Sequence, residues 1–402
     1  MAEGHSHIAV SAPRAPARTT AVLAILVALI GLATAIGAAL VWPHDSSYRG
    51  SVPAEFEGYT WHAARVVGPA DASGNMTAVI DGADALDVRV LLVQPELNMA
   101  PEVGDHVRVL EDDTGQLLFA TYERGSPMLL LAIIYVLLVI AVAWWRGLGA
   151  LVGLALAFGI IIFFTVPSLV EGNSPLLVGL VTGSGALFVL LYLAHGVNAR
   201  TTTAYLGTIA GLIVTGLVGW WAVAASHLTG VWSDAGTSLL YLLREASPPA
   251  LVLCGVILAG IGVLNDVTIT QASAVWEIHG AKPQAARWEL FTRGMRIGRD
   301  HIASTVYTIA FAYVGAALPT IVLVSAYATP LAQTLTSEDI AEEIVRTLVG
   351  SIGLVLAVPL TTVIAVLVVH DHPRRERGDR GGRSAPSTPA PSTPAPTPVS
   401  GA

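Results

Sequence analysis

The chain has 402 residues, of which 53% are hydrophobic and 12% charged, with a formal net charge of −8 and a mean hydropathy of +0.65. This composition excludes an ordinary soluble domain and is typical of a multi-pass membrane protein. The single cysteine, Cys254, excludes an internal disulfide framework, and the single lysine, Lys282, is followed by proline, which excludes a Gly-Lys-Ser/Thr phosphate-binding loop.

Charged residues are spaced so widely that eight stretches between them reach roughly the 20 residues that a helix needs to cross a bilayer. The sequence therefore predicts an all-α polytopic membrane bundle of about eight transmembrane helices. The stretches lie between Arg18 and Asp45, Arg124 and Arg146, Arg146 and Glu171, Glu171 and Arg200, Arg200 and Asp234, Glu245 and Asp266, Asp300 and Glu338, and Arg346 and Asp371.

The sequence around these helices predicts the domain organisation. A cytoplasmic arm, 1–18, precedes transmembrane helix 1 at 19–44, whose apolar stretch is longer than that of a cleavable signal peptide and predicts an uncleaved anchor. Helices 2–8 form a membrane domain at 125–370. Residues 371–402 are first basic and then rich in Pro, Ser and Thr, which predicts a disordered cytoplasmic tail.

Residues 45–124 differ from the rest, since they hold 14 of the 29 acidic residues and no spanning stretch. Five pieces alternate between apolar and polar residues: TWHAARVV, MTAVI, LDVRVLLV, HVRVL and LLFATYE. Such alternation, interrupted by Gly, Pro and Asp, predicts about five strands. We expect a small extracytoplasmic all-β domain, an OB-like barrel or a sandwich, between helices 1 and 2. Its acidic surface excludes nucleic acid as a partner.

The basic residues predict the orientation of the bundle. With the N-terminus inside, 14 of the 21 Lys and Arg residues lie in cytoplasmic segments, whereas the short outer loops hold only Arg244 and Arg346. Because basic residues accumulate in cytoplasmic loops, both termini are predicted to be cytoplasmic. The preference for arginine over lysine fits a bacterial protein.

Small residues and prolines predict how the helices pack. Glycines four residues apart let a neighbouring helix backbone approach closely. Pro319 and Pro359 lie inside the last two predicted spans and predict kinks there. The glycine pairs are Gly149 with Gly153, Gly179 with Gly183, and Gly207 with Gly211.

The stretch GIGVLNDVTITQASAVWEIHGAKPQ places a carboxylate, Asp266, at the end of an apolar helix. At about 1.5 Å per residue, this helix reaches the cytoplasmic boundary about two residues after Asp266. Two interpretations stay open: the carboxylate lines a polar path that binds a cation or carries a proton, or it ends the lipid-embedded span. Thr270, Ser273 and Glu277 share its helix face at i+4, i+7 and i+11, whereas Thr268 and Gln271 lie on other faces.

Residues 269–300 predict a cytoplasmic interfacial segment. An aromatic stripe that includes Trp288 and Phe291, with arginines around it, suits a helix in the headgroup region, and packing against the bundle is the alternative. If the segment folds back, Arg299 pairs with Asp266. Asn265, Asp300 and Arg299 then complete the candidate polar site.

Motifs of enzymes are absent from the sequence: it contains no HExxH, no GxSxG and no carboxylate–histidine pair at catalytic spacing. The sequence therefore predicts no enzyme and no cofactor. His5 with His7 and His370 with His372 resemble metal-binding pairs, but further ligands are missing near them, so no metal site is predicted.

The motifs of the second half resemble a known family. AGIGVLNDVTITQASAVWEI followed by RGMRIGRDHIASTVYTIAFAYVGAALP resembles the C-terminal half of the YibE/F-like membrane proteins, and LAHGVNARTTTAYLGT resembles an upstream span of that family. The resemblance covers roughly residues 125–370; Asp266 matches the family aspartate, and Asn265 departs from the methionine expected beside it. It implies a multi-pass plasma-membrane protein whose extracytoplasmic insertion is the strand-rich segment, and it implies no particular reaction. The remaining matches are Gly298, Arg299 and Asp300, and then Thr305, Thr308, Ala312, Tyr313, Gly315, Leu318 and Pro319.

Two functions follow from these features. In the first, the protein is a secondary transporter or permease for an ion or small solute, with its polar site near Asp266. In the second, it is a membrane scaffold or accessory protein whose external β domain binds a protein partner. Eight spans exceed what the anchoring of one small domain requires, which favours transport.

Overall fold

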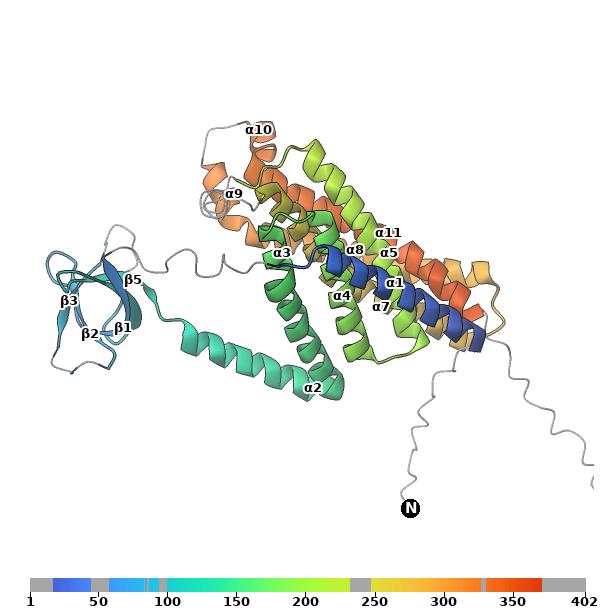
Figure 1. The fold of residues 1–402 in the computed structure, drawn as a ribbon, viewed down its shortest axis with the longest axis horizontal. Helices are drawn as coiled ribbons and strands as arrows, with labels where there is room; N and C mark the ends of the chain where they lie inside the picture. Colours follow the sequence, from blue (N-terminus) through green and yellow to red (C-terminus); the bar gives the residue numbers. More distant parts are fainter. Residues whose placement is uncertain are drawn as a thin grey trace, which may run out of the picture.

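A computed structural model describes residues 17–44, 58–82, 84, 87–93, 100–231, 247–326 and 330–370. The described chain forms a small β-barrel and a bundle of helices (Figure 1). Most of the predicted N-terminal arm, the whole tail 371–402 and the histidines at positions 5, 7 and 372 lie outside the described residues.

The strand-rich segment folds as a closed five-stranded barrel in the order β1-β2-β3-β5-β4. All neighbours are antiparallel except β3 and β5, whose parallel pairing closes the barrel. Alternate residues such as Val66, Val107 and Leu117 point into its core, as period-two alternation requires. The barrel prediction is confirmed, and the sandwich alternative is wrong. The strands are β1 (Tyr59–Gly68), β2 (Met76–Ile80), β3 (Arg89–Leu92), β4 (His106–Asp112) and β5 (Leu117–Tyr122).

Helices account for the rest of the described chain. The first precedes the barrel and all others follow it, so the barrel interrupts the bundle in sequence (Figure 1). They are α1 (Ala17–Leu40), α2 (Gly125–Ile160), the π-helix η2 (Ile161–Thr165), α3 (Val166–Val170), α4 (Pro175–His195), α5 (Ala199–Ala225), α7 (Pro248–Ala281), α8 (Arg287–Ala316), α9 (Leu318–Ser325), α10 (Leu331–Leu335) and α11 (Glu338–His370).

Among the described residues, six helices are long and apolar enough to cross a membrane, or seven if α8 and α9 form one bent span. The bend between α8 and α9 is 63°, and Pro319 lies directly after it. A second break lies within α2, where the backbone of Trp144 leaves the helical region at φ 54° and ψ −135°. The multi-span bundle is therefore confirmed, while the number eight stays a prediction.

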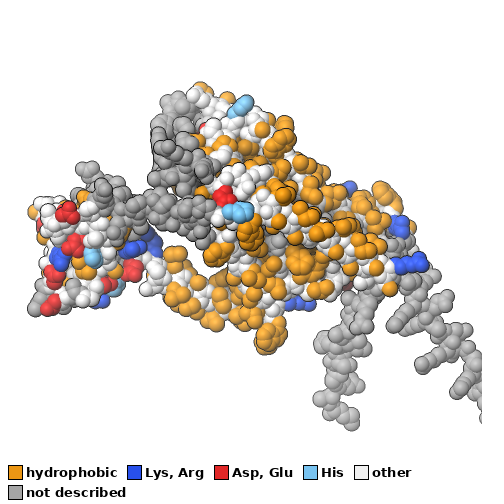
Figure 2. All heavy atoms as spheres, in the orientation of Figure 1, with side chains coloured by type: hydrophobic (Ala, Val, Ile, Leu, Met, Phe, Trp, Pro, Cys, Tyr) orange, Lys and Arg blue, Asp and Glu red, His pale blue; other side chains and the backbone are white. Residues whose placement is uncertain are grey.

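The bundle is built around α5, α7 and α11, which pack against one another along their lengths. Leu212, Ile257 and Leu264 lie in its main apolar core and are almost completely buried. Hydrophobic side chains also cover most of its visible outer surface, whereas charged side chains gather on the barrel (Figure 2). Because water does not tolerate so much exposed apolar surface, lipid is the medium that suits this bundle.

Candidate functional site

The structure places the predicted polar face of α7 on the outside of the bundle. Asp266, Thr270 and Glu277 are exposed, and Ser273 is half-buried. Thr270 donates a hydrogen bond to the backbone carbonyl of Asp266 at 2.8 Å, and Ser273 donates to the carbonyl of Ile269 at 2.7 Å. These hydroxyl groups therefore satisfy their hydrogen bonds within α7 and do not line an internal path.

The other members of the predicted polar site do not converge on Asp266. Arg299 and Asp300 are exposed on α8, and within the described residues no ion pair joins Arg299 to Asp266. Asn265 is half-buried, with its side-chain oxygen buried and without a hydrogen-bond partner in the structure. The predicted Arg299–Asp266 pair is thus not formed in this conformation.

The opposite face of α7 carries the buried polar contacts. The hydroxyl groups of Thr268 and Thr208, from α7 and α5, lie 2.5 Å apart. The Gln271 amide donates to the carbonyl of Gly294 at 3.0 Å and to the hydroxyl of Thr362 at 2.7 Å, and so connects α7, α8 and α11. Uncharged groups that satisfy one another in this way are the polar groups that a lipid-embedded bundle tolerates best.

Glycines make these close helix contacts possible. A Cβ atom at Gly207 would lie 2.1 Å from the Thr361 hydroxyl oxygen, and one at Gly298 would lie 2.5 Å from Val358. Such distances are far below van der Waals contact, so only glycine fits. The same holds on α2, where a Cβ at Gly149 would lie 2.4 Å from the carbonyl oxygen of Leu193 on α4.

The other predicted glycines also lie at helix contacts. Gly153 faces Leu190 on α4, Gly179 faces Ile257 on α7, Gly183 faces Leu212 on α5, and Gly211 faces Ala357 on α11 and Leu264 on α7. Of the predicted kinks, Pro319 lies at the α8–α9 bend, whereas α11 continues as one helix across Pro359.

The predicted interfacial segment 269–300 divides between two packed helices. Its first half continues α7 as far as Ala281, and its second half begins α8, which packs against α7 and α11. Glu289 pairs with Lys282 at 2.7 Å and with Arg293 at 2.8 Å, which fixes the turn between the helices. The segment thus contacts the bundle, and its position relative to a lipid surface stays a prediction.

A second set of hydroxyl groups connects α1, α4 and α5. Thr34 and Ser184 lie 2.8 Å apart, and Ser184 and the Tyr205 hydroxyl 3.0 Å apart. Tyr192 contacts Thr202 at 3.0 Å, and its ring centroid lies 6.0 Å from that of Tyr205. These side chains form a polar and aromatic seam that runs from the bundle interior toward the α4–α5 turn.

A groove of about 1150 Å³ opens beside the outer end of this seam. The start of α1, the end of α4, the start of α5 and the end of α7 form its walls. Leu23 and Val27 line one side, and Tyr192 lines the groove from α4. Arg200 and Glu277 bring opposite charges to the same groove. An apolar pocket of this size with a few polar groups is typical of a binding site.

Within the described chain, neither Arg200 nor Glu277 forms an ion pair or hydrogen bond through its side chain. Arg200 is half-buried and Glu277 is exposed. Of the predicted polar face on α7, Glu277 lines this groove. Two unpaired opposite charges on one largely apolar groove leave room for a ligand that carries both charges.

Sequence reasoning missed the groove and the buried hydroxyl groups. Thr201, Thr208 and Thr215 recur every seven residues and are all buried on one face of α5. Residues seven apart share one helix face, and these threonines lie near Gly207 and Gly211 in the sequence. This spacing could have predicted a polar packing face on α5. The groove had no such signal, because its residues come from four separate helices.

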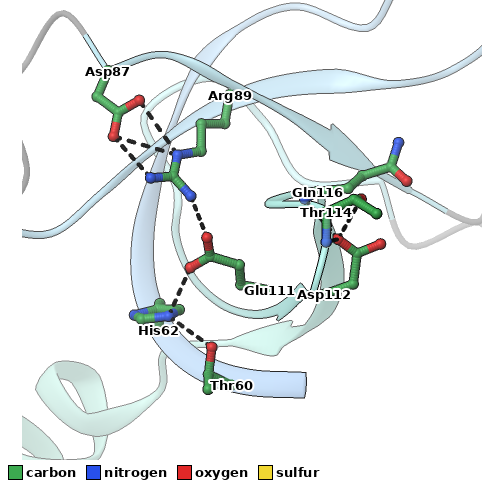
Figure 3. A network of polar contacts seen from close by, with 8 residues as sticks. All are labelled: Thr60, His62, Asp87, Arg89, Glu111, Asp112, Thr114 and Gln116. Atoms are coloured by element: carbon green, nitrogen blue, oxygen red, sulfur yellow. Dashed lines mark hydrogen bonds and ion pairs between the residues drawn. The ribbon is translucent and has the colours of Figure 1, made fainter. Parts of the chain in front are cut away.

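The barrel carries its own polar network (Figure 3). Arg89 on β3 forms ion pairs with Asp87, at 3.0 Å, and with Glu111 on β4, and Glu111 also lies 2.9 Å from His62 on β1. The hydrogen bonds to Asp87 and Glu111 raise the pKa of the Arg89 guanidinium. The network joins strands β1, β3 and β4, so it stabilises the fold of the barrel.

Three exposed side chains of the barrel, Asp81, His106 and Glu123, place their potential ligand atoms within 4.8 Å of one another. Asp81 Oδ2 and His106 Nδ1 lie 3.9 Å apart. Exposed groups approach one another in this way in many proteins without a metal ion. We therefore assign no metal ion to these three side chains. The expectation from the sequence that the protein has no metal site stays a prediction.

The helical part of the chain matches a known protein family. A family model described as YibE/F-like protein matches residues 131–371, which is more than half of the chain. The matched range contains most of the bundle, including Asp266 and the α7–α8–α11 contacts, and begins after the barrel and α1. No curated protein and no solved structure matches the chain.

Proposed function

The chain belongs to the YibE/F-like family, and we propose that it is a permease whose substrate site is the groove between α1, α4, α5 and α7. One observation carries the proposal: the groove lies beside the hydroxyl and aromatic seam that leads through Tyr192 and Tyr205 to Ser184 and Thr34. A substrate leaving the groove would meet hydroxyl groups and aromatic faces instead of hydrocarbon alone. The proposed substrate site is therefore the groove and not the region around Asp266.

The proposed topology has eight crossings. The helical run Gly125–Val170 contains 46 residues and is about 69 Å long, more than twice a hydrocarbon core of about 30 Å. The break at Trp144 divides it into two crossings, and the bent pair α8–α9 supplies one more. An even number agrees with Figure 1, in which α1 begins and α11 ends at the same end of the bundle.

We place the protein in the plasma membrane, as the family resemblance implies, with both termini in the cytoplasm, as the basic residues favour. This orientation puts the groove at the cytoplasmic side. Arg146 follows the break at Trp144, and Arg200 follows the α4–α5 turn. Both lie at helix ends that are predicted to face the cytoplasm. The groove would then open toward the inner leaflet and the cytoplasm.

The scaffold alternative rests on the barrel. It has a core of its own and a charged surface, two properties that suit a module which binds a protein partner. The two functions differ in what they require of the bundle: transport requires water to reach the seam, whereas a scaffold requires only packed helices.

Cysteine labelling of the full chain in sealed vesicles tests the proposal. In a Cys254→Ala background, single cysteines replace Val27 in the groove and Ser184 in the seam, and Thr268 in the α5–α7 contact serves as the packed control. We expect a membrane-impermeant thiol reagent to label position 27 rapidly from one side, to label position 184 more slowly, and to leave position 268 unlabelled. Complete protection of position 184 from both sides would contradict a transport path and favour the scaffold.

A further inference from the structure

The groove combines two surfaces that a single ligand can match. Leu23, Val27 and Phe188 offer an apolar wall, whereas Arg200 and Glu277 offer one positive and one negative charge. A purely anionic ligand would satisfy Arg200 but leave Glu277 without a positive partner. A small polar ion would leave the apolar wall without a partner, and a hydrocarbon would leave both charges without one.

We propose that the groove binds a zwitterionic phospholipid whose headgroup carries a phosphate and a primary ammonium group. Arg200 binds the phosphate, because a guanidinium donates several charge-assisted hydrogen bonds to phosphate oxygens. Glu277 accepts hydrogen bonds from the ammonium group. An acyl chain lies along the apolar wall of α1 beside Phe188.

The position of the groove supports a lipid over a free solute. Its walls include the first turns of α1 and of α5 and the last turns of α7, so it lies where helices end and headgroups begin. Asn198 and Thr202 add polar atoms at the same level. Trp276 lines the groove as well, and tryptophan is enriched at this depth of a membrane protein.

This assignment rests on the groove that the proposed function uses, and it names the class of substrate. It is separable from transport, since a lipid can bind selectively without being moved. The measurement below reports binding alone, and the labelling of positions 27 and 184 reports a path through the bundle.

Fluorescence quenching of Trp276 tests the assignment. The full chain is reconstituted in phosphatidylcholine vesicles that contain a small fraction of brominated phosphatidylethanolamine, brominated phosphatidylglycerol or brominated phosphatidylcholine. Bromine quenches only nearby tryptophans, and the chain contains nine. The difference between the wild-type protein and a Trp276→Phe variant isolates the signal from the groove.

We expect phosphatidylethanolamine to compete about tenfold better than either other lipid for the position beside Trp276, since one charge-assisted hydrogen bond is worth about that factor. Glu277→Gln should remove the preference over phosphatidylglycerol, and Arg200→Gln should weaken both phospholipids. Arg200→Lys should retain most of the binding. Arg146→Gln and Asp266→Asn, which remove exposed charges outside the groove, serve as matched controls and should change nothing.

Three results would overturn the assignment: equal quenching by all three headgroups, a preference for phosphatidylglycerol, or a preference for phosphatidylethanolamine that survives Glu277→Gln. If selectivity is absent while position 184 is labelled, the zwitterionic lipid is wrong and the permease stands. If selectivity is present while position 184 is protected, the lipid site stands and transport fails.

Discussion

The bundle and the barrel use polar side chains in opposite ways. Among the described residues, the polar side chains buried in the helices are those of Thr, Ser and Gln together with the hydroxyl-bearing Tyr205, and none is charged. On the barrel, charged side chains such as Arg89 on β3 and Glu111 on β4 pair with one another while remaining partly exposed.

The difference follows from the medium that surrounds each part. Water screens and solvates the charges of the barrel, so an ion-pair network there costs little and contributes modestly. A charge in the interior of a lipid-embedded bundle has no such compensation, whereas a hydroxyl group can satisfy itself on the carbonyl four residues earlier. Thr203, Thr215 and Thr362 all do so. We therefore expect packing changes to dominate the stability of the bundle, and charge changes to matter only for the barrel.

The largest effect is expected for Gly207→Leu. The new Cβ would overlap Thr361, a β-branched residue that has no room to turn away, so overpacking should cost about 3 kcal/mol or more. Thermal or denaturant unfolding of the purified full chain measures this. Gly262→Leu is the matched control, because open space surrounds the Cβ position of Gly262. An equal loss for both variants would contradict the packing argument.

Gln271→Leu should have the next largest effect. It removes two buried hydrogen bonds and leaves the Gly294 carbonyl without that donor, which should cost about 1–2 kcal/mol in a membrane protein. The same unfolding measurement applies, with Thr270→Val on the exposed face of α7 as the control. Equal stability of the wild-type protein and Gln271→Leu would show that the α7–α8–α11 contact is held by apolar packing alone.

Glu111→Gln should have a smaller effect, and one confined to the barrel. It removes the ion pair with Arg89 and the contact with His62, so the barrel should unfold at a lower temperature. Added salt should reduce the difference between the wild-type protein and the variant, because salt screens partly exposed charges. Near-ultraviolet circular dichroism follows the unfolding. A difference that does not change with salt would contradict an electrostatic origin.

The turn after β4 should make the barrel sensitive to acid. Hydrogen bonds from the hydroxyl of Thr114 and from the backbone amides of Gln116 and Thr114 lower the pKa of Asp112 below its ordinary value of 3.8. The folded barrel therefore binds this proton less readily than the unfolded chain, so the contribution is complete above about pH 3.8 and is lost as the pH falls below it. Asp112→Asn should flatten this part of the pH profile of barrel stability.

The smallest effect is expected for Asp266→Asn. The carboxylate is exposed and makes no ion pair within the described chain, so stability should change by less than about 0.5 kcal/mol. Labelling of position 184 should also stay unchanged if the groove is the substrate site. A loss of labelling in this variant would return the site to Asp266, as the sequence first suggested.

The sequence by itself determined that this protein divides into a helical bundle and a β-barrel. All five predicted strand segments became strands, because alternation of apolar and polar residues is a local property that one strand expresses alone. The apolar stretches became long helices for the same reason. The motif around Asp266 was also enough to suggest the family, since a motif is contiguous in the chain.

Only the tertiary structure decided which polar residues of α7 face inward. On the sequence, the carboxylates Asp266 and Glu277 were the more conspicuous. Thr268 nevertheless faces Thr208 on α5, and Gln271 faces α8, where glycines leave room for its side chain. The groove likewise exists only where four helices meet. Helical periodicity says which residues share a face, but the choice of the buried face depends on neighbours that lie far away in the chain.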